Sequence, residues 1–134
     1  MSQENVEVVR RLLDAFGRRD YYEATRCLHE DAEWHNTASF PGPRTVTGSR
    51  AISEFWDTLV ESFDESEGGS EIEKVAVGSD RVVVGIRTQG RGAGSGVPID
   101  VRYGLGFSLK EGRIRRVDVS GSYAKALEAA GLSE

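Results

Sequence analysis

The chain has 134 residues, the size of one domain, and its 17 basic and 22 acidic side chains give a net charge of −5. This charge argues against a nucleic-acid partner, because neutralising a phosphate backbone needs a basic surface. The longest apolar run, within residues 82–86, is too short to cross a membrane, the first residues show no secretory signal, and a single cysteine forms no internal disulfide. We therefore expect a cytoplasmic protein that contacts no membrane.

The first half of the chain predicts three helices. Residues 3–16 carry apolar side chains at helical spacing. Asp20 precedes Glu23 by three residues, a variant of the capping box that predicts a short helix ending at Leu28. The strongest pattern follows residue 49, where an apolar stripe marks one helix face: Ile52, Phe55, Trp56, Leu59, Val60 and Phe63.

The second half of the chain predicts strands. Residues 32–36 form a short first strand, and beyond residue 68 the apolar period changes from 3.6 to 2. Three short turns suit antiparallel hairpins between four strands, which span residues 72–77, 81–89, 97–109 and 113–120. In the last strand Ile114, Val117 and Val119 are spaced by three and then two, which indicates a bulge. Residues 122–130 predict a last short helix.

Helices that precede an antiparallel meander indicate an α+β fold, in which the helices cover one face of a sheet. We expect a single domain spanning residues 1–134. Its sheet should be cone-shaped, curved and mostly antiparallel, with three N-terminal helices on its concave face and a short C-terminal helix.

Five segments in this order resemble the SnoaL-like branch of the nuclear transport factor 2-like superfamily: residues 4–11, 28–34, 48–52, 107–114 and 126–132. The resemblance covers the whole chain. It implies an apolar pocket between the helices and the concave face, and a homodimer formed through the convex face. Members include ketosteroid isomerases, polyketide cyclases, epoxide hydrolases, dehydratases and non-catalytic binding proteins.

Proton transfer in the catalytic members rests on buried carboxylates whose pKa the pocket tunes. The positions in this chain that match those carboxylates are Asn36, Leu105 and Val119. None is an acid, and the amide of Asn36 can orient a carbonyl group but cannot accept a proton as a base. The resemblance therefore implies the fold and a pocket, and it carries none of the family's known reactions onto this chain.

Strand alternation separates the candidate site residues by face. Trp34 and Asn36 share one face of the first strand, and Glu33 and His35 share the other. The same alternation turns Tyr103 inward. We therefore expect a pocket for a small hydrophobic molecule, lined by Trp34, Asn36, Phe40, Trp56, Tyr103, Leu105 and Val119. The aromatic side chains could instead simply fill the core, and the helical stripe favours that interpretation for Trp56. The amide of Asn36 and the phenol of Tyr103 need a polar partner that a ligand could supply.

Three functions stay open at this point. The leading hypothesis is a small-molecule-binding protein without a cofactor. The first alternative is an enzyme of the cyclase, isomerase or epoxide-hydrolase type with a non-standard site, for which His35, Tyr103 and Asn36 are the catalytic candidates. The second is a dimerisation module with a filled pocket. The acidic and histidine residues within 29–35 do not have the spacing of a zinc motif, and we expect no metal there.

Overall fold

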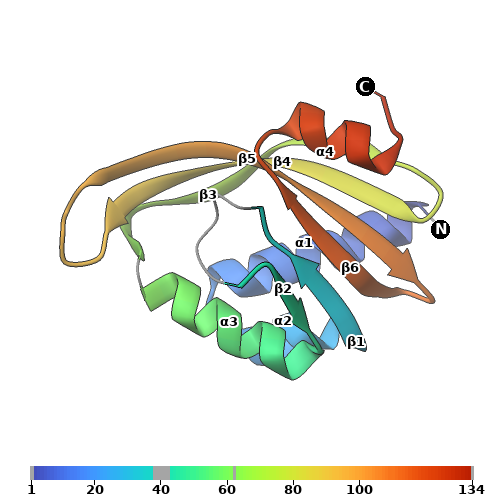
Figure 1. Ribbon diagram of the computed structural model, residues 1–134, viewed down its shortest axis with the longest axis horizontal. Coiled ribbons are helices and arrows are strands. Elements are labelled where there is room, and N and C mark those ends of the chain that lie inside the picture. The colour runs from blue at the N-terminus through green and yellow to red at the C-terminus, as the bar shows by residue number, and fades with distance from the viewer. Residues whose placement is uncertain (1, 38–42, 62, 134) are drawn as a thin grey trace.

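The computed structural model describes residues 2–37, 43–61 and 63–133, and the side chains among them except residues 2, 60 and 61 and 63–68. These residues form a six-stranded sheet in the order β2-β1-β6-β5-β4-β3, with helices on both faces (Figure 1). The pairing of β1 with β6 is parallel, and the other neighbours are antiparallel. The expected α+β fold with a mostly antiparallel, curved sheet is confirmed.

Local capping explains where two of the helices begin. The Asp20 carboxylate accepts a hydrogen bond from the Glu23 amide, at 3.1 Å, and the Ser122 hydroxyl accepts one from the Lys125 amide, also at 3.1 Å. None of the helices in the described part of the chain is long and apolar enough to cross a membrane. The helices are α1 (Ser2–Gly17), α2 (Tyr21–Arg26), α3 (Ser49–Glu61) and α4 (Tyr123–Ala130).

The predicted alternation of apolar residues is followed most closely in the last three strands. The predicted bulge is confirmed, because the register between β5 and β6 shifts so that residue 115 has no partner on β5. The strands are β1 (Leu28–His35), β2 (Thr45–Thr47), β3 (Phe63–Val77), β4 (Arg81–Gly92), β5 (Pro98–Lys110) and β6 (Arg113–Ser120).

Several predicted boundaries are wrong, among them the start of β3, which lies at Phe63 instead of residue 72. Helix α2 ends at Arg26 instead of Leu28, and β1 begins at Leu28, which pairs with Ile114 of β6. Residues 29–31 therefore lie in a strand, within the stretch between Leu28 and Glu33 where the register with β6 shifts. The helical stripe was predicted to continue to Phe63, but α3 ends at Glu61 and Phe63 is the first residue of β3. Periodicity alone does not mark the residue at which a helix ends.

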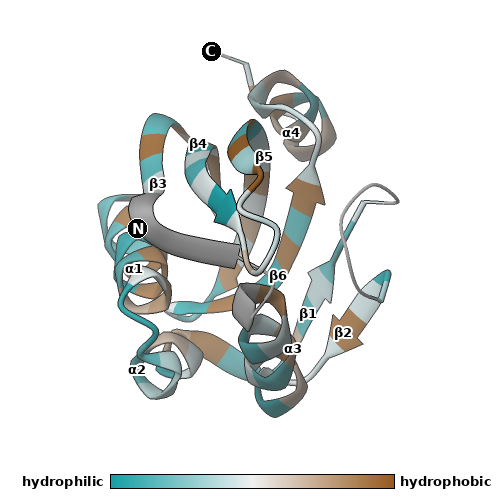
Figure 2. Cartoon of the chain, turned by 90° about the vertical axis from the view of Figure 1, so that its left-hand side faces the viewer, coloured by the Kyte–Doolittle hydropathy of each residue, from teal (hydrophilic) through white to brown (hydrophobic). Residues whose placement is uncertain are grey.

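Three helices and the inner face of the sheet enclose the main core. Figure 2 shows α1, α2 and α3 on one side of the curved sheet and α4 on the other. The sheet contributes alternate side chains to this core, and those of β4 and β5 include Val82, Val84, Leu105 and Phe107. The predicted assignment of strand faces is therefore confirmed, and this inner face is the concave face of the sheet.

Helix α4 packs on the outer face, over β4, β5 and β6. Its Ala126 and Leu127 bury against Val83. Helix α4 lies very close to β5. A Cβ atom built on Gly104 would lie 2.6 Å from the Ser122 carbonyl oxygen and 2.8 Å from the Ala126 Cβ. This outer face is the one through which the resemblance implies pairing of two copies. The oligomeric state stays a prediction.

Candidate functional site

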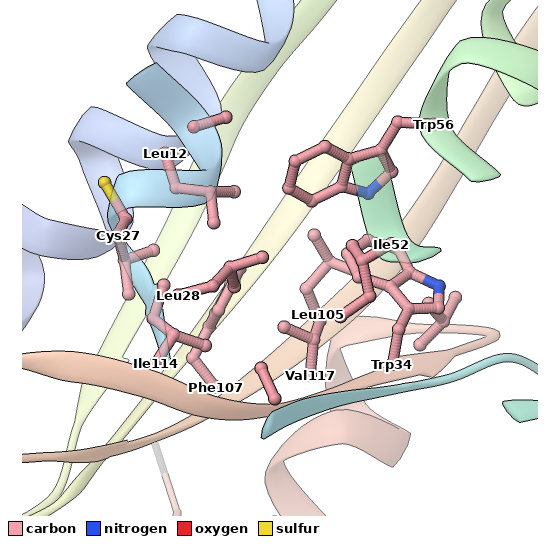
Figure 3. Close-up of a cluster of buried hydrophobic side chains, with 14 of the residues drawn as sticks. Leu12, Cys27, Leu28, Trp34, Ile52, Trp56, Leu105, Phe107, Ile114 and Val117 are labelled. Atoms are coloured by element: carbon pink, nitrogen blue, oxygen red, sulfur yellow. The ribbon is translucent and has the colours of Figure 1, made fainter. Parts of the chain in front are cut away.

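An aromatic cluster lies between the concave face and the helices. The rings of Trp34 on β1 and Trp56 on α3 meet edge to face, with centroids 5.9 Å apart (Figure 3). Phe16 of α1 meets Trp56 in the same way at 5.5 Å, and Phe55 lies 6.0 Å from Trp34. Trp56 has no exposed surface, and Trp34 is buried. Such edge-to-face pairs add specific geometry to the burial of apolar area.

Both polar groups of the Asn36 side chain form hydrogen bonds within the protein. Its side-chain oxygen accepts a hydrogen bond of 2.7 Å from the indole N–H of Trp34, and its amide nitrogen donates one of 2.7 Å to the Pro43 carbonyl oxygen. Its backbone N–H also donates to the Arg44 carbonyl oxygen, at 2.8 Å. The structure thus supplies the polar partners that this buried amide needs, and it needs no ligand to satisfy them.

The two tryptophans differ in their hydrogen bonding. The indole N–H of Trp34 is paired with Asn36, whereas the indole N–H of Trp56 is buried and has no acceptor within the described residues. Burying a donor without an acceptor costs about 1–3 kcal/mol, so such groups are few in native proteins. The indole N–H of Trp56 is therefore a buried donor of the cluster that needs an acceptor.

A row of hydroxyl groups crosses three neighbouring strands. The Ser70 and Thr88 hydroxyls lie 2.8 Å apart, and the Thr88 hydroxyl lies 3.3 Å from that of Tyr103. Thr88 shares its strand face with Val84 and Ile86 of the core, and it is buried, whereas Tyr103 is half-buried. The row gives the concave face a polar region beside its apolar one.

The other predicted lining residues have different placements. Leu105 and Val119 are buried members of the main core cluster, on the concave face as expected. Phe40 lies outside the described residues. Sequence reasoning missed Ser70 and Thr88, although the alternation along residues 82–88 already puts Thr88 on the same face as Val82.

His35 lies on the opposite face of β1 from Trp34. Its Nε2 is 2.8 Å from a carboxylate oxygen of Glu33, and its Nδ1 is 3.4 Å from the Thr45 hydroxyl. The three catalytic candidates are consequently not brought together, because Asn36 and Tyr103 belong to the concave side and His35 does not.

Ionisable groups are scarce in this interior. Where burial is described, the buried polar residues are Asn5, Asn36 and Thr88, and none of their side chains ionises near neutral pH. The buried Cys27 thiol is the remaining candidate, and burial raises its pKa, so it stays protonated. The buried side chains of the described concave side therefore offer neutral hydrogen-bonding groups and no base.

Comparison with known protein families gives one result that covers most of the chain. The SnoaL-like domain matches residues 9–117. A search of the curated proteins finds no match to the chain.

Solved structures similar to this chain share its fold over nearly the full length. A nuclear transport factor 2-like protein from Burkholderia xenovorans is 18% identical, with a TM-score of 0.77 and coverage of 96% of this chain and 97% of its own. TerC, co-crystallised with polyporic acid, is 18% identical, with a TM-score of 0.76 over 93% of this chain and 96% of its own. A protein of ketosteroid isomerase-like fold from Catenulispora acidiphila, in complex with trimethylamine, is 18% identical, with a TM-score of 0.74 over 95% and 94% of the two chains. At these identities the likeness shows the fold alone.

Proposed function

The chain belongs to the SnoaL-like domain family, and on that premise we propose that it binds a small, mainly apolar molecule between the concave face and helices α1–α3. One observation carries this proposal: the indole N–H of Trp56 is fully buried and lacks an acceptor within the described residues. A ligand that carries a carbonyl or ether oxygen would accept that hydrogen bond, while its apolar body would contact the surrounding aromatic rings.

The surroundings of Trp56 suit such a ligand. Phe16 and Trp34 present ring edges to it, and Leu105 lies below it on the sheet (Figure 3). Small-molecule sites in proteins are mostly apolar, with few polar groups that fix the orientation of the ligand. The Thr88 and Tyr103 hydroxyls, 3.3 Å apart, would provide a second polar contact on the same face.

Binding is favoured over catalysis because the buried polar side chains of the described interior include no acid or base. Acid–base catalysis needs a titratable group within reach of the substrate. Among the residues whose burial is described, the buried polar side chains are all uncharged, and His35 faces the other side of the sheet with Glu33 as its partner. The small molecules named with TerC and with the Catenulispora protein are further support, because both proteins share this fold.

The two tryptophans provide a direct test. The chain has two indole N–H groups, so its proton–nitrogen correlation spectrum should show two indole signals. We expect titration with a naphthoquinone, an apolar two-ring probe with carbonyl acceptors, to shift the Trp56 signal strongly. The Trp34 signal should move less, because its N–H is already bonded to Asn36 at 2.7 Å.

Matched phenylalanine variants separate binding from stability. Trp56→Phe removes an N–H that has no acceptor among the described residues, so it should weaken probe binding and keep most of the stability. Trp34→Phe removes a paired N–H and orphans the Asn36 oxygen, which should cost about 1–3 kcal/mol of stability. If a panel of quinones, aromatic ketones and ethers leaves both indole signals unmoved, and native mass spectrometry finds no co-purified molecule, the proposed function is wrong.

A further inference from the structure

A hollow lies outside the aromatic cluster, where α2 leads into β1. Its volume is about 360 Å³, and α1, α2, β1, α3 and β6 all contribute to its wall. In Figure 1, α2, the start of β1 and the first turn of α3 lie together at the lower edge of the molecule. We call it the α2–β1 pocket, and its charged and hydroxyl-bearing wall consists of Arg11, Glu23, Thr25, Arg26, Glu30, Ser49 and Arg113.

The floor of the α2–β1 pocket separates it from the concave-face site. Cys27 and Leu28 line the pocket and are 3% and 2% exposed, and both also belong to the main core cluster. Figure 3 shows them packed with Ile114 at one end of that cluster, away from Trp56. A molecule in this pocket would therefore rest on the outside of the core.

Two of the three arginines have unused donors. Arg26 lies 3.9 Å from a Glu23 carboxylate oxygen, and its guanidinium carbon lies 5.9 Å from the centre of the Tyr22 ring. The guanidinium groups of Arg11 and Arg113 have no ion pair or hydrogen bond with any described residue. A guanidinium group presents donors in a planar fork that fits the two oxygens of a carboxylate or phosphate.

The charges of the wall leave an excess of positive charge. Three guanidinium groups stand against the two carboxylates of Glu23 and Glu30, and Glu23 is already close to Arg26. The Cys27 thiol adds no negative charge, because burial raises its pKa and its sulfur donates to the Glu23 carbonyl oxygen at 3.8 Å. The pocket therefore favours an anion.

The start of α3 adds a further attraction for negative charge. The Gly48 carbonyl accepts the first hydrogen bond of the helix, from the Ile52 N–H at 2.9 Å, which puts Gly48 at the capping position. Its φ of +97° favours glycine, so the residue at the capping position of this 13-residue helix has no side chain with which to cap the first amides. Amides at a helix start attract anions, and Ser49, the first residue of α3, lines the pocket.

From these observations we infer that the α2–β1 pocket binds a small oxyanion, a molecule that carries a phosphate or carboxylate group. Arg11 and Arg113 bind its oxygens from opposite elements, and Ser49 donates from its hydroxyl and from the helix start. This site is independent of the proposed concave-face site, since no residue is shared between Trp56 with its aromatic neighbours and the wall of the pocket.

Inorganic phosphate and acetate, titrated separately into the full chain at constant ionic strength, test the inference. We expect saturable shifts of the backbone amide signals of residues 49–51 in the proton–nitrogen correlation spectrum. If phosphate binds more tightly than acetate, the ligand of this pocket is a phosphate-bearing molecule. If acetate binds more tightly, the ligand is a carboxylate-bearing molecule. The absence of a saturable shift with either anion, where chloride serves as the reference, would overturn the inference.

Arginine variants with neighbouring controls show whether the pocket is responsible. Arg11→Gln and Arg113→Gln should each weaken binding about tenfold, the factor that corresponds to about 1.4 kcal/mol. Arg10→Gln and Arg115→Gln remove the same charge from exposed residues next to them in the chain, outside the pocket wall. The controls should change the dissociation constant less than about twofold, as a long-range charge does when salt screens it. Equal losses in all four variants would mean non-specific attraction and would also overturn the site.

Discussion

Asn36 accepts the indole N–H of Trp34 at 2.7 Å, two residues away on the same face of the chain. The same amide donates to the Pro43 carbonyl oxygen at 2.7 Å, so Asn36 acts at once as acceptor and donor. Among side chains of this size, an amide can do both, while an ionised carboxylate can only accept. These two hydrogen bonds give a structural reason for an asparagine at this position. In isomerase-type members the resemblance implies a catalytic aspartate there.

We predict that Asn36→Asp destabilises the protein at neutral pH. The introduced carboxylate still accepts from Trp34, but it faces the Pro43 carbonyl oxygen without a proton to donate. Leaving a buried acceptor unsatisfied beside a charge costs about 2 kcal/mol or more. Urea unfolding at neutral pH measures this difference, and a variant as stable as the parent chain would contradict the structural role of Asn36.

The pH dependence of the same variant has a definite sign. Burial and the facing carbonyl should raise the pKa of the introduced carboxyl above its value in the unfolded chain. The loss of stability should then be smallest below the unfolded-state pKa, where a protonated carboxyl donates to Pro43, and should grow as pH rises through the folded-state pKa. Asn36→Ala is the control, because it loses both hydrogen bonds without a titratable group and its penalty should not vary in this range.

Sequence alternation predicted the inner face of the sheet well, because β4 and β5 each bury a continuous series of alternate apolar residues. Val82, Val84 and Ile86 on β4 and Leu105 and Phe107 on β5 all point into the core. The alternation also placed Trp34 and Asn36 together. Their mutual hydrogen bond was not predictable, since it depends on side-chain rotamers and on Pro43 returning to the same place.

Other strands could not be predicted because backbone pairing, not side-chain pattern, defines them. In β2 only Val46 is buried, and three residues are too few to show a period. The first part of β3 is rich in acidic residues and glycines, and its pairing with β4 skips register between Asp64 and Gly69. The α2–β1 pocket was also missed, because Arg11, Ser49 and Arg113 are far apart in sequence.

An ion pair on β4 and β5 should make a small, pH-dependent contribution to stability. Arg87 binds both carboxylate oxygens of Asp100, at 2.9 and 2.8 Å, and this hydrogen bonding lowers the pKa of Asp100. A lowered folded-state pKa means that the contribution is fully present above the unfolded-state pKa and is lost as pH falls through the folded-state value. The stability difference between the parent chain and Asp100→Asn should therefore shrink on acidification.

Chemical denaturation over a series of pH values measures that difference. Asp57→Asn, which removes an exposed carboxylate of α3 away from this ion pair, is the matched control for the loss of one surface charge. A difference for Asp100→Asn that grows towards low pH would contradict the assigned direction of the pKa.

Because α4 lies close to the sheet, substitution by alanine should have different effects at two glycines of β5, Gly104 and Gly106. A Cβ at Gly104 would meet the Ser122 carbonyl oxygen at 2.6 Å and the Ala126 Cβ at 2.8 Å, whereas a Cβ at Gly106 would find its nearest neighbour, the Asp118 carbonyl oxygen, at 4.0 Å. Gly104→Ala must therefore displace α4, and we expect it to cost about 1–3 kcal/mol. Gly106→Ala should be neutral or stabilise by up to about 1 kcal/mol, since alanine restricts the unfolded chain.

Urea unfolding of both glycine variants gives the global difference, and hydrogen exchange of the α4 amides locates it. In Gly104→Ala the amides of residues 126–130 should exchange faster than in the parent chain, because the helix no longer packs at its original distance from β5. In Gly106→Ala their protection should be unchanged. Equal stability of the two variants would mean that α4 rests on the sheet more loosely than the contact with Ser122 implies, and that the outer face is open to a different packing of this helix.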